Sequence, residues 1–248
     1  MIDKHAQMLY NKEKYEEGCE MQNEGIAKRV ESIKEELKNG NAFGEKVLLV
    51  AATKMQDADA VNMAIAAGVD AVAENKPQEF RDKNEALLPC PRHFIGHLQT
   101  NKIKYLLGKI ELYHSCDRDD LARELARLSV AKGSVSSVLL QVNIGGEQTK
   151  GGYDYEEMQE VFARVSAMEG LCVKGFMAML PEAGEEEELR EMVRKMRRLL
   201  DWAKTQSPSV EYLSMGMSGD YRLCVEEGSN IVRLGSTIFG KRDYGNGR

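Results

Sequence analysis

Apolar residues recur along this chain in two alternating patterns, stripes at helical spacing and short uninterrupted runs. The first stripe consists of Ile26, Val30, Ile33 and Leu37. Because intervals of three and four residues place these side chains on one face of a helix, the stripe predicts a helix that ends at Asn39-Gly40. We therefore expect residues 1–40 to form a helical segment that packs on the rest of the fold.

After residue 40 the pattern predicts eight strands with helices between them. The expected strands are residues 47–52, 69–73, 93–95, 111–114, 138–144, 171–176, 211–213 and 231–234. Alternation of strands and helices favours a parallel sheet, and eight such units in roughly 250 residues is the usual size of a closed (β/α)8 TIM barrel. We expect a single domain over residues 1–248, since no linker or composition break divides the chain.

A doubly wound open sheet is the alternative fold. No Gly-x-Gly-x-x-Gly motif follows the first expected strand, which weakens the dinucleotide-binding version of that fold. One expected helix carries acidic residues 185–188 early and basic residues 194, 195, 197 and 198 late. This order matches the helix dipole, so we interpret both charge runs as structural rather than as a binding surface.

Composition and charge favour a protein of the cytoplasm. The net charge is −6 with a pI near 5.5, which argues weakly against a nucleic-acid partner. The longest apolar run is too short to span a bilayer, and the N-terminus lacks an apolar signal core. We therefore expect a cytoplasmic location and neither a membrane nor a nucleic acid as partner.

Cysteine and histidine positions predict neither disulfides nor a metal site. The five cysteines are scattered and include no Cys-x-x-Cys pair. His93 and His97 are four residues apart, but the residues between them have the character of a strand and turn rather than of a helix. The helical spacing that would place two ligands on one metal is therefore missing.

Lys54 directly follows the apolar run 47–52, with only Thr53 between. An apolar run without polar alternation is typical of a strand buried on both faces, and an ammonium group at its end is costly. Most lysines in such a position extend to water. A lysine held in a dry place instead loses its proton more readily, and its amine can then form a Schiff base with an aldehyde.

Two loops rich in glycine and serine follow the last two expected strands. They are residues 214–218, Ser-Met-Gly-Met-Ser, and residues 235–237, Gly-Ser-Thr. Barrels often bind a phosphate with the loops after strands seven and eight, because glycine permits close backbone approach and free amides point at the anion. Ordinary turns also use these residues.

A ligand with both an aldehyde and a phosphate would satisfy Lys54 and these two loops together. Pyridoxal 5′-phosphate is the obvious candidate, since it forms Schiff bases with lysine. Arg233, at the end of the last expected strand, could approach the pyridine nitrogen of this cofactor or serve as an ion-pair residue of the barrel rim. A permanently charged guanidinium beside the nitrogen would oppose its protonation and weaken the cofactor as an electron sink.

Six segments of the chain resemble, in order, the YggS/PROSC-like pyridoxal phosphate homeostasis proteins. They are residues 48–54, 73–75 with 78–79, 93–102, 175–179, 213–218 and 232–240. The blocks within 95–102 and 214–218 are highly specific. Two positions depart from the family, Ala73 where glycine is usual and Lys76 where many members have an aromatic residue.

The resemblance implies a fold-type III barrel like the N-terminal domain of alanine racemase. It implies that Lys54 carries the Schiff base, that Asn75 lies beside the cofactor ring, and that Arg233 faces the pyridine nitrogen. The residues implied to surround the phosphate are Ser214, Gly216, Ser218, Gly235 and Ser236. Met177, in the matching segment 175–179, is a further expected cofactor contact.

The resemblance also implies a carrier that buffers pyridoxal 5′-phosphate or delivers it to apoenzymes, without turnover or catalytic residues of its own. We expect a monomer. A racemase-like enzyme is the alternative; it needs a second acid/base on the opposite cofactor face and a second domain, for which we expect no room before Arg248. A third hypothesis is a barrel enzyme in which Lys54 acts on a sugar phosphate.

Overall fold

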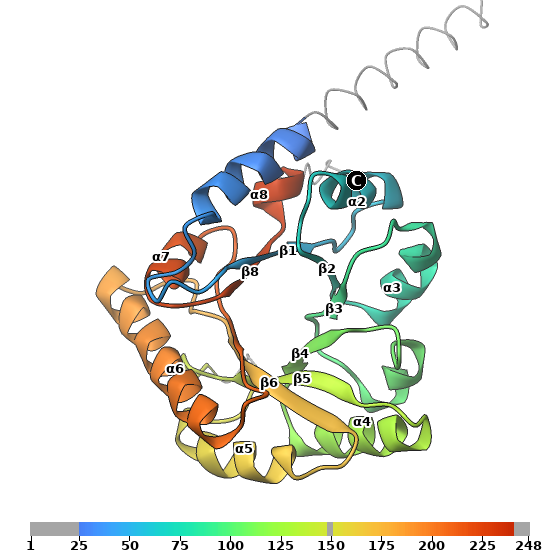
Figure 1. Cartoon of the computed structure of the whole chain (residues 1–248), viewed down its shortest axis with the longest axis vertical. Helices are drawn as coiled ribbons and strands as arrows, with labels where there is room; N and C mark the ends of the chain where they lie inside the picture. Colours follow the sequence, from blue (N-terminus) through green and yellow to red (C-terminus); the bar gives the residue numbers. More distant parts are fainter. Residues whose placement is uncertain (1–24, 148–150, 241–248) are drawn as a thin grey trace, which may run out of the picture.

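Parallel strands close into a barrel in sequence order (Figure 1). The computed structural model describes residues 25–147 and 151–240. Its strands are β1 (Leu48–Ala52), β2 (Ala71–Glu74), β3 (Arg92–Phe94), β4 (Leu112–Cys116), β5 (Ser136–Val142), β6 (Leu171–Ala178), β7 (Tyr212–Ser214) and β8 (Ile231–Leu234). Pairing of β8 with β1, with Leu48 opposite Ile231, closes the ring. The predicted (β/α)8 barrel is confirmed, and the open-sheet alternative is wrong.

Helices and short 3₁₀ turns cover the outside of the barrel (Figure 1). They are α2 (Ala58–Ala66), α3 (Pro77–Lys83), η1 (Asn84–Ala86), η2 (Thr100–Tyr105), α4 (Asp119–Ala131), η3 (Tyr155–Glu157), α5 (Met158–Ser166), α6 (Glu186–Gln206), α7 (Tyr221–Glu226) and α8 (Ser236–Phe239). The Asp57 side chain caps α2 by accepting a hydrogen bond from the backbone N–H of Ala60. Pro77 is the first residue of α3, where its missing N–H costs nothing.

The predicted N-terminal helix lies partly within the described residues. Residues 25–37 are helical, and the four residues of the first stripe are buried there against β1, α2, β8 and α8. The Arg29 Nε–H donates to the Ile238 carbonyl at 2.6 Å, and Figure 1 shows this helix beside α8. Residues 1–24 lie outside the described residues.

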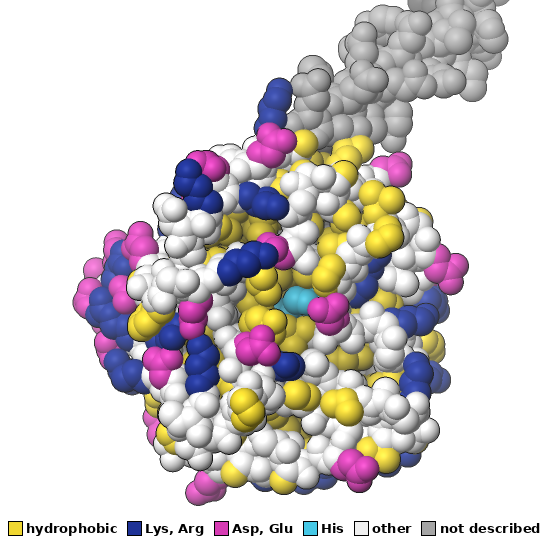
Figure 2. All heavy atoms as spheres, viewed as in Figure 1, with side chains coloured by type: hydrophobic (Ala, Val, Ile, Leu, Met, Phe, Trp, Pro, Cys, Tyr) yellow, Lys and Arg dark blue, Asp and Glu magenta, His cyan; other side chains and the backbone are white. Residues whose placement is uncertain are grey.

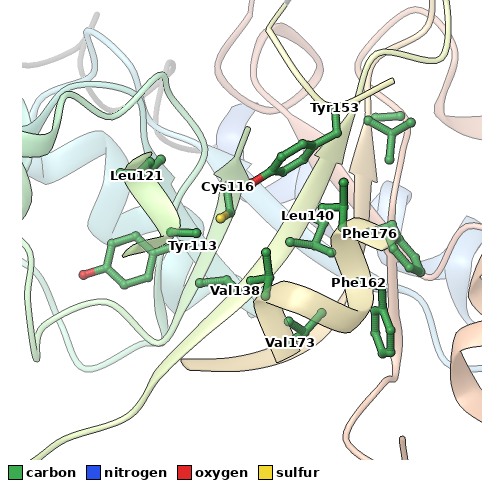
Figure 3. Close-up of a cluster of buried hydrophobic side chains, with 14 of the residues drawn as sticks. Tyr113, Cys116, Leu121, Val138, Leu140, Tyr153, Phe162, Val173 and Phe176 are labelled. Atoms are coloured by element: carbon green, nitrogen blue, oxygen red, sulfur yellow. The ribbon is translucent and has the colours of Figure 1, made fainter. Parts of the chain in front are cut away.

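One apolar layer lies inside the barrel, and an outer layer lies between the strands and the helical coat. Figure 3 shows part of the outer layer, where outward-facing side chains of β4, β5 and β6 pack with α4 and α5. The inner layer consists of Val50, Ala71, Ala73, Leu112, Leu139, Met177 and Ile231. Because successive strand residues point to opposite faces, each inner residue has outward-facing neighbours.

Strand ends differ from the prediction at three places that bear on the site. Glu74 and Ser214 were expected in loops, but they are the last residues of β2 and β7. Met177 and Ala178 were also expected in a loop, but β6 extends through both. The reason is that the polar side chains of Glu74 and Ser214 find buried hydrogen-bond partners, so the strand continues through residues that resemble loop residues in sequence.

Two arginines of α6 pair with acidic residues at the end of α7. Arg190 contacts Glu226 and Glu227 at 2.8 and 2.9 Å, and Arg194 contacts Glu227 at 2.8 Å. Figure 2 shows the interspersed basic and acidic side chains on the flank where α6 and α7 lie. These ion pairs join α6 to α7, in line with the structural interpretation. Across residues 25–147 and 151–240, none of the helices has the length and apolar character needed to cross a membrane.

Candidate functional site at the carboxyl ends of the strands

Lys54 stands just beyond β1, at the carboxyl end of the barrel. Its side chain is only partly buried, so the dry position suggested by the sequence is wrong. Residue 54 lies past the last strand residue, Ala52, and so beyond the apolar wall. Among the residues that the structure describes, the Lys54 amine makes neither a hydrogen bond nor an ion pair. Lys54 is therefore a partly exposed residue whose amine has no partner among the described residues.

A buried polar cluster fixes the loop that carries Lys54. The Lys83 ammonium donates to the carbonyls of Thr53 and Gln56 at 2.7 and 3.1 Å. It also pairs with Glu74, and the two side chains are only 11% and 5% exposed. The Thr53 hydroxyl donates to the Glu74 carboxylate as well. One ion pair thus holds both backbone carbonyls that flank the Lys54–Met55 segment.

Met55 adds a strained backbone conformation to the same loop. Its φ is +60°, in the left-handed region that a residue with a side chain seldom adopts. The Met55 N–H donates to the Glu79 carboxylate at 2.8 Å, which holds this conformation from α3. The backbone beside Lys54 is therefore set before any ligand arrives.

Asn75 lies in the neighbouring loop, after β2. The Thr53 N–H donates to the Ala73 carbonyl at 2.9 Å, so the loops after β1 and β2 run side by side. Gly96, after β3, backs directly onto Asn75. A Cβ at position 96 would lie 2.0 Å from the Asn75 carbonyl oxygen, so only glycine allows this approach. Lys54 and Asn75 thus share one edge of the barrel mouth.

Arg233 projects from β8 into the barrel interior and is 5% exposed. Its Nη1 donates to the carbonyl and hydroxyl oxygens of Ser214 at 2.7 and 2.6 Å, and its Nη2 donates to the Ala178 carbonyl at 3.2 Å. Burial lowers its pKa to about 10, so it is still a cation at neutral pH. In the described part of the chain it has no carboxylate partner, and the rim ion pair considered from the sequence is absent there.

Three predicted phosphate or cofactor residues lie deeper than expected. Ser214 is completely buried, and its hydroxyl contacts Arg233 and His114 rather than the loop at Ser218. Met177 is an apolar residue of the inner layer. Gly216 has φ of +106°, and a Cβ there would meet Tyr221 Cα at 2.9 Å, so the turn and α7 both require glycine.

The other residues expected to bind the phosphate, Ser218, Gly235 and Ser236, lie together at the start of α8. The Thr237 N–H donates to the Ser218 hydroxyl at 3.2 Å, which joins the loops after β7 and β8. Within residues 25–147 and 151–240, the N–H groups of Gly235 and Ser236 have no hydrogen-bond acceptor. A Cβ on Gly235 would lie 3.5 Å from the Ala52 carbonyl, so this loop lies against the end of β1. Free N–H groups and the amine of Lys54 therefore occupy adjacent strand ends.

These groups fit a ligand that carries both an aldehyde and a phosphate. The free N–H groups are suited to an anion, and the Lys54 amine to a carbonyl. The hydrogen bonds of Arg233 to described residues use Nη1 and Nη2. Its Nε–H is therefore available to a ring nitrogen or another acceptor. Across the described ranges, no group of three or more His, Cys, Asp or Glu side chains could hold a metal ion.

The sequence did not predict that two histidines, His93 and His114, lie inside the barrel. His114 is completely buried on β4, and its Nδ1 lies 2.9 Å from Ser214 Oγ. Its Nε2 lies 3.0 Å from Nδ1 of His93 on β3. Period-two alternation places His114 on the same face as the inner residue Leu112, which is the signal that could have located it inside the barrel.

His93 is expected to make the protein less stable as the solution is acidified. Burial lowers its pKa from 6.5 to about 4, so the unfolded chain binds the proton more readily than the folded one between these values. The free energy of unfolding should therefore fall as pH decreases from about 6.5 toward 4, and His93 should contribute about 3 kcal/mol of this loss beside the contribution of buried His114. Urea titrations at several pH values measure this loss. An equally large loss over the same pH range in His93→Phe would contradict the assignment.

The comparisons with known proteins agree with the fold. A family model described as the N-terminal domain of alanine racemase matches residues 23–243. The pyridoxal phosphate homeostasis protein of Aquifex aeolicus is 40% identical over 199 residues, 79% of this chain and 87% of the relative. PipY of Synechococcus elongatus, solved with PLP bound, superposes with a TM-score of 0.76 at 29% identity over 87% of this chain and all of PipY.

An alanine racemase of Corynebacterium glutamicum shares the fold alone. Its TM-score is 0.70 at 17% identity, over 89% of this chain and 62% of the racemase. A closed parallel barrel with a free lysine after its first strand is thus an alanine-racemase-type barrel of fold type III. Within that class, the chain belongs to the family of pyridoxal phosphate homeostasis proteins.

Proposed function

We propose that this protein binds pyridoxal 5′-phosphate through a Schiff base on Lys54 and takes part in the homeostasis of this cofactor as a buffer or donor. The observation that carries the proposal is the partner-free amine of Lys54 beside the free N–H groups of Gly235 and Ser236. The names of the homologues and the PLP-bound structure of PipY support the same ligand.

The proposed site assigns a distinct role to each predicted residue. Lys54 forms the covalent link: its ammonium loses a proton, the amine adds to the aldehyde, and water leaves as the C=N bond forms. Ser218, Gly235 and Ser236 hold the phosphate, and Asn75 lies beside the ring. Arg233 faces the pyridine nitrogen, while Ser214, Gly216 and Met177 act behind these contacts, as supports for Arg233, the turn and the barrel interior.

Arg233 favours a carrier over an enzyme. The cofactor supplies electron withdrawal to bound amino acids when its ring nitrogen is protonated. Arg233 is buried and positively charged, so it opposes that protonation and leaves the ring a weak electron sink. We therefore propose that the protein has no turnover of its own. From the sequence we also propose a monomeric single domain over residues 1–248, a cytoplasmic location and apoenzymes as recipients of the cofactor. We propose neither a nucleic acid nor a membrane as partner.

The visible spectrum of the purified protein tests the proposed function. Titration with pyridoxal 5′-phosphate should produce the absorption band of a Schiff base, and borohydride should fix the label irreversibly as a secondary amine. Mass mapping of the reduced protein should place this label on Lys54. A label on a different lysine would refute the site.

Two further outcomes identify the alternatives. Conversion of L-alanine to D-alanine by the loaded protein would establish the racemase-like enzyme. The complete absence of a Schiff base band at saturating cofactor would favour the barrel enzyme that acts on a sugar phosphate.

A further inference from the structure

A chain of four buried polar side chains crosses the barrel interior beneath the proposed site. Arg233 donates to Ser214 Oγ at 2.6 Å, Ser214 Oγ lies 2.9 Å from His114 Nδ1, and His114 Nε2 lies 3.0 Å from His93 Nδ1. These residues belong to β8, β7, β4 and β3. Since β7 and β4 are not neighbours in the barrel, the contact of Ser214 with His114 must pass through the interior.

The hydrogen-bonding capacity of each group gives this chain one direction. Arginine can only donate, so Ser214 Oγ accepts from Arg233. Among the described residues, the only acceptor within reach of the Ser214 hydroxyl hydrogen is His114 Nδ1, so Ser214 donates to it. Neutral His114 then carries its hydrogen on Nε2 and donates to His93 Nδ1. Neutral His93 in turn carries its hydrogen on Nε2. Every link from Arg233 to His93 is then satisfied, as buried polar groups require.

Both histidines are neutral at physiological pH. Burial lowers the pKa of His93 to about 4. Burial also lowers the pKa of His114 well below its usual value, and the nearby His93 and Arg233 add to this effect. A second positive charge next to the Arg233 guanidinium would be costly in this interior. Arg233 is the single cation among these four side chains, and it therefore fixes the direction of the hydrogen bonds between them.

His93, the last of these four side chains, lines a cavity at the amino ends of the strands. This cavity has a volume of about 340 Å³ and is lined by His93 together with residues that precede or begin the strands, among them Asp70, Glu111 and Tyr212. The chain of hydrogen bonds thus extends from this lower cavity to the guanidinium at the carboxyl-end mouth. His93 keeps the His114 ring in place from below, and His114 keeps the Ser214 hydroxyl in place.

We propose that His114, supported by His93, is a positioning residue for Arg233. By accepting the Ser214 hydrogen, His114 leaves the Ser214 oxygen lone pairs turned to the guanidinium, which fixes Arg233 with its Nε–H free for the cofactor ring. This inference rests on the proposed function, because it assigns the purpose of the chain to the ring of pyridoxal 5′-phosphate.

Substitutions at His114 distinguish the contributions of its two ring nitrogens to cofactor binding. His114→Phe removes both at similar volume, and it should weaken the affinity for pyridoxal 5′-phosphate by about tenfold or more and shift the Schiff base band. His114→Asn keeps an acceptor near the position of Nδ1 and should retain most of the affinity. Leu139→Ala, which removes apolar volume from the same interior, is the control: it should lower the melting temperature and leave the band and affinity unchanged.

A double-mutant cycle shows whether His114 acts through Arg233. Arg233→Gln alone should weaken binding, and adding His114→Phe to it should cause little further loss. If the two effects instead multiply, or if Leu139→Ala weakens binding as much as His114→Phe, the positioning role is refuted.

The histidine tautomers give a test that needs no cofactor. Nitrogen-15 NMR of the unliganded protein should find both rings neutral with hydrogen on Nε2, and hydrogen on Nδ1 of His114 would refute the inference. A wild-type protein without a Schiff base band refutes the proposed function, whatever the tautomers are. A normal wild-type band with multiplicative mutant effects refutes the inference alone.

Discussion

Lys54→Ala is expected to abolish both the Schiff base band and the label fixed by borohydride. The amine is the only part of the side chain that the proposed link uses, and no other group in the described site can replace it in the covalent step. The unliganded protein should keep its stability within about 0.5 kcal/mol, because the Lys54 amine has no partner among residues 25–147 and 151–240 to lose. Absorbance, mass mapping and urea unfolding measure these three results.

Lys76→Ala is the matched control for this substitution. Lys76 lies in the next loop, is 59% exposed, and makes only a long contact of 3.4 Å with Glu79. The variant should keep the band and the label on Lys54. A band that survives in Lys54→Ala, or one that disappears in Lys76→Ala, would contradict the assignment of the covalent link.

Lys83→Met is expected to lower the free energy of unfolding by about 3–5 kcal/mol, because it leaves a buried carboxylate without its counter-ion. One oxygen of Glu74, Oε2, already lacks a hydrogen-bond partner, so the remaining carboxylate would depend on Thr53 alone. The carbonyls of Thr53 and Gln56 would lose their donor as well. The loop of Lys54 should loosen, and the affinity for pyridoxal 5′-phosphate should fall with stability.

Two comparison variants sharpen this experiment, with urea unfolding as the measurement. Adding Glu74→Gln to Lys83→Met removes the unpaired charge and should restore part of the lost stability. Lys46→Ala breaks an ion pair with Asp70 whose lysine is 74% exposed, and it should cost less than about 1 kcal/mol. A cost for Lys83→Met no larger than that of Lys46→Ala would show that the buried pair does not stabilise the loop.

Local sequence signals were sufficient to predict the barrel and the position of Lys54. The run 47–52 and seven similar runs mark the strands, and Asp57 and Pro77 mark the starts of two helices. These signals depend on residues a few positions apart, where period and capping act. The position of a lysine directly after a buried strand follows from the same information.

The depth of polar side chains could not be predicted in this way. Ser214 resembles a loop residue in sequence, yet it is buried because partners from β4 and β8 cross the barrel to reach it. His114 and Ser214 are 100 positions apart in the chain. Glu74 and Lys83 pair only because α3 folds back over β2. Such contacts depend on which side chains meet across the closed ring, and no local pattern reveals that.

Closure of the ring has a consequence for when this protein can first capture its ligand. Lys54 follows β1 and the proposed anion-binding turn follows β8, and these two strands pair at the last seam of the barrel. A ribosome-bound chain that lacks β8 would have the amine but not the N–H groups proposed to hold the anion. Ligand capture should therefore wait for complete synthesis, and bound cofactor should then lock the first and last strands together, stabilising only the finished barrel.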